Sequence, residues 1–327
     1  MQSDFSNNLL LEVDDNLKLS KKADLLFTQQ VESWSLAKTG YESLSTVQKK
    51  FFEFDNFSIE AHFNPGRIIS SSAKVDDKSI KERPCFLCVQ NLPSEQRAIK
   101  IDDEYLLLVN PFPIFDKHFT IPSIHHIPQS IKNSFESMLT ISEMLGRDFT
   151  LFYNGPKCGA SAPDHLHFQA GNSGFMKIEN EFYQILNKYG NTINDTYDFT
   201  TTAVTGCLRN FISIESNEIV PLKNEFERVL NALSSNSSEE PMLNIICTYY
   251  NFWKVIIFPR KKHRPTYFFE EGAKQILISP AAVDMGGVLI FPREEDFKKV
   301  NRELIIDIFN QVTFNDDEFK TIIDKLV

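Results

Sequence analysis

The stretch that decides the fold is residues 154–169, which read NGPKCGASAPDHLHFQ. Its last five residues alternate polar and apolar side chains, as a strand with one buried face does. His165, His167 and Gln169 therefore share one face, and the two apolar residues between them face the core. The small-residue loop before them offers backbone N–H groups that suit an anion. Because neutral imidazole is a good nucleophile, this row indicates phosphoryl chemistry on a nucleotide.

The composition of the whole chain is that of an ordinary globular protein. Its 327 residues are 42% hydrophobic and 24% charged, which suits one large domain or two and excludes a disordered chain. The net charge of −10 disfavours nucleic acid and anionic membranes as partners. No membrane span or secretory signal is visible, and five cysteines argue against a disulfide scaffold. We therefore expect a cytoplasmic protein that binds neither nucleic acid nor membrane.

Short strands alternate with helices along the chain. Apolar spacing predicts helices over residues 24–38, 131–145, 175–189 and 222–233, and two more close the chain. Strands are expected at residues 57–63, 105–109, 119–121, 149–153, 165–170, 242–250, 252–258, 275–279 and 287–291. Because many strands arrive in short pairs mixed with helices, the pattern predicts an α+β fold rather than a doubly wound parallel sheet.

The motif His-x-His-x-Gln at residues 165–169 resembles that of the transferase branch of the HIT (histidine triad) superfamily. This branch includes galactose-1-phosphate uridylyltransferase, diadenosine tetraphosphate phosphorylase and the GDP-hexose phosphorylases. Three further motifs occur upstream in the same order: Asn64-Pro65, then CFLC at residues 85–88, then LVNPFP at residues 108–113 followed by His118 and PSIH. The resemblance implies a HIT-like antiparallel sheet with flanking helices, and a second, degenerate HIT-like half.

The resemblance also divides the chain into three segments. Residues 1–50 are expected to form an N-terminal helical arm. Residues 51–200 form the HIT-like catalytic half that carries His-x-His-x-Gln. Residues 201–327 form a second α+β half, which is either a degenerate HIT-like copy or a substrate-binding unit.

The resemblance assigns the chemistry to His167 and Gln169. His167 matches the nucleophile that takes up the nucleotidyl group as a phosphoramidate; the alternative is a structural histidine on a strand. Gln169 stands where the hydrolase branch has a third histidine. An amide donates a hydrogen bond to a phosphoryl oxygen but does not exchange protons with water. The covalent intermediate should therefore outlive hydrolysis and wait for an anionic acceptor.

Further residues match nucleotide- and phosphate-binding positions of the family. One extra residue separates Ser161 from His165, so the loop backbone is the more secure phosphate contact. Asn110 matches an asparagine near the nucleotide sugar, but it could equally form the turn before Pro111. The predicted nucleotide- and phosphate-binding set is Asn110, Asn154, Gly159, Ser161 and Arg67. His118 could face the phosphates or cap a strand, and the basic run at residues 260–264 could be a phosphate pocket or a solvated loop.

The resemblance further implies a structural zinc site of the Cys2His2 type. Its expected ligands are Cys85, Cys88, His125 and His165, with His126 as the rival to His125 because adjacent residues point in opposite directions. Zinc would hold the catalytic strand against the N-terminal segment. The alternatives are two reduced cysteines in a turn or a redox pair. No organic cofactor is expected.

Together these residues predict a nucleotidyltransferase or phosphorylase that works by double displacement. Its substrate would be a nucleoside diphosphate sugar or a dinucleoside polyphosphate, and its intermediate a nucleotidyl-histidine. The acceptor would be inorganic phosphate, which is favoured, or a sugar phosphate. A dinucleoside polyphosphate hydrolase and a catalytically silent, zinc-stabilised nucleotide-binding protein are the alternatives. The sequence leaves the base, the sugar and the oligomeric state open.

Overall fold

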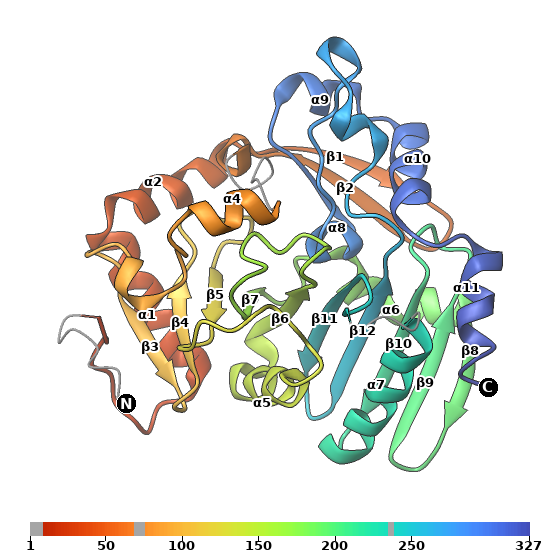
Figure 1. Ribbon diagram of the computed structural model, residues 1–327, viewed down its shortest axis with the longest axis horizontal. Helices are drawn as coiled ribbons and strands as arrows, with labels where there is room; N and C mark the ends of the chain where they lie inside the picture. Colours follow the sequence, from red (N-terminus) through yellow and green to blue (C-terminus); the bar gives the residue numbers. More distant parts are fainter. Residues whose placement is uncertain (1–8, 69–75, 235–238) are drawn as a thin grey trace.

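A computed structural model describes residues 9–68, 76–234 and 239–327 of the chain (Figure 1). Its strands are β1 (Gln48–Glu53), β2 (Ser58–Phe63), β3 (Ala98–Ile101), β4 (Tyr105–Val109), β5 (His118–Pro122), β6 (Phe149–Asn154), β7 (His167–Asn172), β8 (Gly190–Asp195), β9 (Phe199–Val204), β10 (Phe211–Ser216), β11 (Leu243–Tyr249), β12 (Trp253–Pro259) and β13 (Val288–Phe291). Its α-helices are α1 (Leu19–Ser33), α2 (Ser35–Ser43), α4 (Asp77–Glu82), α5 (Phe135–Leu145), α6 (Lys177–Tyr189), α7 (Ile219–Leu233), α8 (Ala282–Met285), α9 (Glu294–Lys299), α10 (Arg302–Val312) and α11 (Asp316–Ile323).

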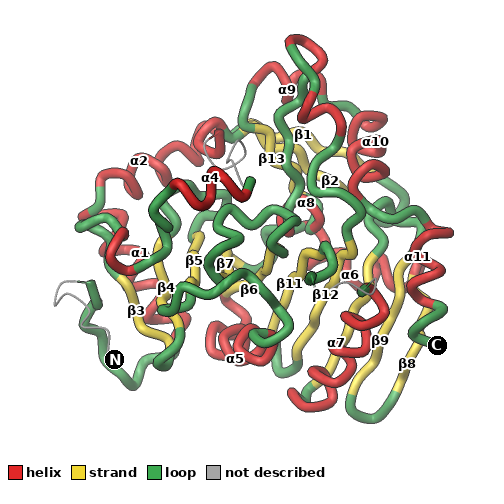
Figure 2. The backbone as a smooth tube through the Cα atoms, in the orientation of Figure 1, coloured by secondary structure: helices red, strands yellow, loops and turns green. Residues whose placement is uncertain are grey.

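One antiparallel sheet of ten strands organises the molecule. Its order is β3-β4-β5-β7-β6-β11-β12-β10-β9-β8, and Figure 2 shows these strands as a continuous yellow row. A small second sheet, β1-β2-β13, joins the N-terminal region to the C-terminal region through the parallel pair of β2 and β13. The predicted α+β fold, an antiparallel sheet with flanking helices, is confirmed.

The large sheet repeats one topology twice. In the first half, β3, β4, β5, α5, β6 and β7 give the strand order 3-4-5-7-6. In the second, β8, β9, β10, α7, β11 and β12 give the order 8-9-10-12-11. The halves join through the antiparallel pair β6 and β11. Because the repeat begins at β8, the expected boundary between residues 200 and 201 falls inside β9.

The two faces of the sheet pack against different elements. Side chains of α1, α5, α7 and α11 form one core with one face, and Leu166 and Phe168 lie in that core as predicted. Elements α6, α8 and α10 cover the other face together with the three-stranded sheet. Along this second face, Leu108 pairs with Thr120 and Thr120 with Gln169. The face of β7 that carries the predicted catalytic residues is therefore the one on which elements from the N-terminal and the C-terminal regions pack.

Several local expectations were wrong. The helix expected over residues 24–38 is two helices that meet at Trp34. Residues 275–279 form no strand, although Ile276 and Ile278 are buried in the core beside α8. Strands β8 and β9 escaped prediction because GNTIND and FTTTAV carry almost no alternating apolar pattern.

Among the residues that the structure describes, no helix combines the length and the apolar character needed to cross a lipid bilayer.

Candidate functional site

His167 lies at the start of β7 with its ring buried and its hydrogen bonding fixed. Its Nδ1 lies 2.8 Å from the carbonyl oxygen of His165, so Nδ1 carries the proton and Nε2 the lone pair. No described residue bonds to Nε2. Burial lowers the pKa of His167 to about 4, so the ring is neutral near pH 7. A neutral imidazole with a free Nε2 is the reactive form of a nucleophilic histidine.

Gln169 follows on the same face of β7, and a second histidine fixes its amide. The Nε2 of His118 lies 3.0 Å from Gln169 Oε1, and the N–H of Ile114 donates to His118 Nδ1 at 3.3 Å. His118 is therefore protonated on Nε2 and donates to the amide oxygen. The NH2 group of Gln169 remains as a donor beside His167. His118 thus contacts Gln169 and does not cap a strand.

One cavity of about 580 Å³ contains this face. All seven residues predicted for catalysis and for nucleotide and phosphate binding line it: His167, Gln169, Asn110, Asn154, Gly159, Ser161 and Arg67. The second half of the chain adds Ser279, Ala281, Val283, Asp284 and Ile290. The sequence carried no signal that the fold brings these residues to the strand of His167.

The loop after β6 is held in place by the second half of the chain. Asn154 Oδ1 accepts hydrogen bonds from Asn244 Nδ2 at 2.9 Å and from the N–H of Ala282 at 2.8 Å. Both acceptor positions of that oxygen are then filled, which leaves the amide NH2 as a donor at the cavity wall. Gly159 has a φ of +101°, and a Cβ there would lie 2.6 Å from the Cβ of Ala281. Only glycine allows this close approach.

Two arginines give the cavity positive charge. Arg67 Nη1 donates to the carbonyl oxygen of Phe112 at 2.6 Å, and burial lowers its pKa to about 10, which leaves it protonated. Arg83 Nη2 pairs with Asp164 Oδ1 at 2.8 Å. The Nη1 of Arg83 is buried and has no hydrogen-bond partner among the described residues. Both side chains line the cavity, so they can meet a phosphate chain.

Asn110 forms the turn that was expected before Pro111, and its side chain also lines the cavity. Its Oδ1 accepts from the N–H of Phe112 at 2.9 Å, which forms the turn after β4, and its Nδ2 donates to Thr120 Oγ1 at 3.2 Å. The second N–H of that amide remains for a ligand in the cavity, which Asn110 lines.

The basic run at residues 260–264 is not simply a solvated loop. Arg260 is 2% exposed, and its N–H groups donate to Asn244 Oδ1 and to four main-chain carbonyls. Asn244 in turn fixes Asn154, so Arg260 orients a cavity residue and has no donor left for a phosphate. Ser279, on the cavity wall, bonds to both His263 and Arg264.

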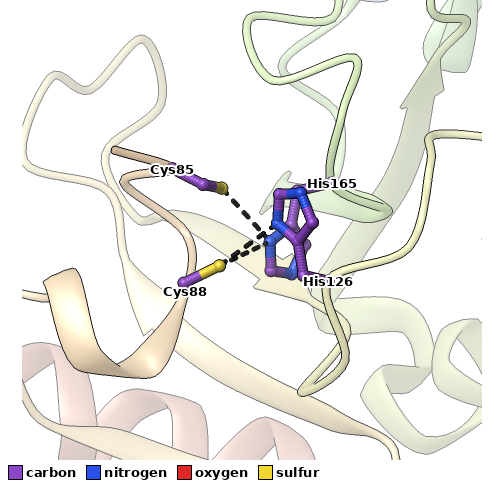
Figure 3. Close-up of side chains that lie close together, drawn as sticks. All are labelled: Cys85, Cys88, His126 and His165. Atoms are coloured by element: carbon purple, nitrogen blue, oxygen red, sulfur yellow. Dashed lines mark hydrogen bonds between the residues drawn. The ribbon is translucent and has the colours of Figure 1, made fainter. Parts of the chain in front are cut away.

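Cys85, Cys88, His126 and His165 form a cluster beside the cavity (Figure 3). Cys85 Sγ lies 3.3 Å from His165 Nδ1, and Cys88 Sγ lies 3.2 Å from His126 Nδ1. All four potential ligand atoms lie within 4.8 Å of one another. Tetrahedral zinc with Zn–S and Zn–N bonds of ordinary length places S and N ligands about 3.5 Å apart. His165 Nε2 donates to the Ser123 carbonyl at 2.8 Å, which turns the Nδ1 lone pair to the sulfurs.

The expectation that His125 completes this cluster was wrong, and its rival His126 takes the place. After β5 ends at Pro122, the N–H of His125 donates to Ser123 Oγ at 3.1 Å. This turn directs the next residue, His126, toward Cys88. The four side chains therefore fit a Cys2His2 metal site in which His126 takes the place expected for His125.

Gln129 is a residue that sequence reasoning missed. It is 3% exposed and bridges the point where β6 and β7 diverge. Its Oε1 accepts from the N–H of His167 at 2.8 Å, and its Nε2 donates to the carbonyls of Asn154 and His167 at 2.9 and 3.0 Å. A single glutamine after a proline carries no sequence signal for this role.

Two family models match separate parts of the chain. Residues 26–172 match the family model for a domain of unknown function (DUF4922), and residues 199–327 match that described as GDPGP1-like, C-terminal domain. The sequence has no significant match among curated proteins.

Solved structures extend the comparison to nearly the whole chain. The crystal structure of yeast Ap4A phosphorylase Apa2 superimposes with a TM-score of 0.58 at 15% identity, over 93% of this chain and 96% of that one. Its complex with Ap4A gives a TM-score of 0.57 at 15% identity, over 93% and 99%. A uridylyltransferase structure matches with a TM-score of 0.37 at 12% identity, over 62% of this chain and 88% of that one. The chain thus shares the HIT-like fold of the Ap4A phosphorylase, with a large antiparallel sheet flanked by helices.

Proposed function

We propose that this protein is a nucleotidyltransferase of the phosphorylase type that works through a nucleotidyl-His167 intermediate. The observation that carries the proposal is the state of His167: its Nδ1 is bound to a carbonyl, and its Nε2 is free. The ring lines a cavity shared with Gln169, Asn154, Arg67 and Arg83.

In the first step, Nε2 of His167 attacks the α-phosphorus of a bound nucleotide. The P–N bond forms as the P–O bond to the leaving phosphate breaks, and that oxygen keeps the electron pair. The amide NH2 of Gln169 donates to a phosphoryl oxygen as negative charge builds there. The His165 carbonyl stabilises the cationic ring through the proton on Nδ1.

In the second step, an oxygen of an anionic acceptor attacks the same phosphorus and the P–N bond breaks. The electron pair returns to Nε2, so His167 is neutral and ready again. Gln169 neither accepts nor donates a proton to water, which favours an acceptor that arrives as an anion. Arg67 and Arg83 supply positive charge for that acceptor, and inorganic phosphate is the acceptor that we favour.

The fit of the Cys2His2 cluster supports a bound zinc ion with Cys85, Cys88, His126 and His165 as ligands. Such an ion supplies structural cross-linking between the segment before β3 and the start of β7. His165 is two residues from His167, so fixing His165 also fixes the nucleophile. Four protein ligands leave no open position, and no catalytic step needs the metal.

The substrate class that we propose is a dinucleoside polyphosphate or a nucleoside diphosphate sugar. The likeness in fold to an Ap4A phosphorylase and the match to a GDPGP1-like domain support this choice.

Intact-protein mass spectrometry without phosphate tests the intermediate. We expect wild type incubated with Ap4A and with ADP-, GDP- and UDP-sugars to gain one nucleoside monophosphate from one donor. Added phosphate should discharge it. His167→Ala should gain nothing, while the control His125→Ala, which alters an exposed neighbour outside the cavity, should label as wild type does.

Two other results would replace the proposal. Donor consumption by wild type with no adduct and no added acceptor would indicate a hydrolase. Tight nucleotide binding with neither adduct nor consumption would indicate a silent binding protein.

A further inference from the structure

Gln96 is a buried amide in the cavity wall that the proposed mechanism does not use. It precedes β3, is 6% exposed, and lines the cavity. Its Nε2 donates to the carbonyl oxygen of Val109 at 3.2 Å. No residue in the described part of the chain donates to its Oε1, which is also not among the fully enclosed atoms without a partner. That oxygen is therefore an accessible acceptor without a partner among the described residues, on a side chain that lines the cavity.

The orientation of this amide is fixed from two sides. A reversed amide would set its oxygen against the Val109 carbonyl, and two acceptors would then face each other. Gln30 of α1 anchors the flanking backbone, since it donates to the Glu95 carbonyl at 3.1 Å and accepts from the N–H of Arg97 at 2.9 Å. The acceptor is thus held in place before any ligand binds, which is how specificity is built into a rigid site.

The surroundings of Gln96 are apolar and lie at one end of the cavity. Leu92 packs against a buried cluster that contains Leu108 of β4, and both line the cavity with Leu87 and Pro93. Leu108 pairs across the sheet with Thr120, which pairs with Gln169. Two strand spacings, about 10 Å, therefore separate the Gln96 end from the phosphoryl end. The ribose of a nucleotide bridges such a distance, and Asn110, which directly follows β4, donates to Thr120 of the intervening strand β5.

We propose that this apolar end is the nucleobase subsite and that Gln96 Oε1 accepts a hydrogen bond from an amino group of the base. This inference rests on the proposed function, because it needs the α-phosphate beside His167. A base without that amino group would leave the buried oxygen unpaired or facing another acceptor. Sites built to bind a polar group discriminate strongly against analogues that lack it.

Binding of matched nucleoside monophosphate pairs tests this proposal without turnover. AMP and purine riboside monophosphate, GMP and IMP, and CMP and UMP differ at the group that Gln96 would read. We expect wild type to bind the amino member of its preferred pair about tenfold or more tightly. Gln96→Met should bind both members alike, because it keeps the side-chain length and loses the acceptor. Gln48→Met, a substitution at an exposed position on β1, is the matched control.

Equal affinity of wild type for both members, or a preference that Gln96→Met keeps, would overturn the proposal. The wild-type comparison alone decides the matter if the variant does not fold. Covalent labelling of His167 is measured in parallel. If donors with and without the amino group label His167 equally, the role of Gln96 alone is refuted. If the protein neither binds nucleotide nor becomes labelled, the proposed function is refuted as well.

Discussion

His118 Nε2 lies 3.0 Å from Gln169 Oε1, and this contact determines which end of the Gln169 amide meets a ligand. A free glutamine amide can present either its oxygen or its NH2 group. Because His118 Nδ1 accepts from the N–H of Ile114, only its Nε2 carries a proton, and Gln169 must present NH2 to the cavity. An oxygen in that place would repel a phosphoryl group. We therefore propose that His118 is a positioning residue that acts through Gln169.

We expect His118→Leu to slow nucleotidyl transfer about 10- to 100-fold while the Kd for nucleotide changes little, because the lost donor acts mainly on developing charge. Single-turnover kinetics beside equilibrium binding measure the two effects. The double variant with Gln169→Leu should be no slower than Gln169→Leu alone. Additive losses would mean that His118 acts by another route.

The same histidine makes stability depend on pH. Burial lowers the pKa of His118 to about 3, below the value of about 6.5 for an unfolded histidine. The unfolded chain therefore binds a proton first as pH falls. The contribution of the neutral ring to stability is complete above about pH 6.5 and is lost as pH falls toward 3.

Urea unfolding at several pH values between 7.5 and 4.5 measures this contribution. The free energy of unfolding should fall more steeply with decreasing pH in wild type than in His118→Leu, by up to about 1.4 kcal/mol per pH unit. Other titrating groups contribute equally to both proteins. Parallel curves would show that His118 is protonated in the fold or titrates normally there.

The proposed zinc site predicts different effects for substitutions of two adjacent histidines. His126→Ala should weaken zinc binding at least about tenfold and lower the thermal midpoint, because it removes one of four ligands. His125→Ala should keep the metal content of wild type. Elemental analysis after dialysis against a mild chelator measures both. Equal zinc retention by the two variants would exclude His126 as a ligand.

The pair His125 and His126 also marks a limit of sequence reasoning. The row of His165, His167 and Gln169 on one face follows from strand alternation, which is a local property. Which of two adjacent histidines reaches Cys88 depends on a turn after Pro122 and on the Ser123 hydroxyl, and alternation no longer applies there.

Contacts between distant parts of the chain could not be predicted from the sequence either. Ala281 touches the loop at Gly159, and Ala282 donates to Asn154, across more than 120 positions. The fold class and the seven cavity residues could be predicted because they depend on periodicity and on motifs. The wall from the second half could not, since it depends on how β6 and β11 join the two halves.

Gln129 gives the most direct test of how the nucleophile is held. Gln129 does not line the cavity, and in the described part of the chain its side chain is hydrogen-bonded only to the backbone of His167 and Asn154, so we expect its effect on catalysis to pass through them. Gln129→Ala leaves three buried main-chain groups without a partner and should reduce the free energy of unfolding by about 2–4 kcal/mol. Its transfer rate, measured well below its thermal midpoint, should also fall at least about tenfold.

Gln129→Glu distinguishes the contribution of the amide oxygen from that of the amide NH2 group. A carboxylate still accepts from the N–H of His167, but it sets oxygen against the carbonyls of Asn154 and His167. If the nucleophile is positioned only when Gln129 bridges both strands, the transfer rate of Gln129→Glu should be no higher than that of Gln129→Ala. The reason is that repulsion at the two carbonyls pushes β6 and β7 apart. Recovery of the wild-type rate with glutamate would mean that the bond to the His167 N–H alone positions the nucleophile.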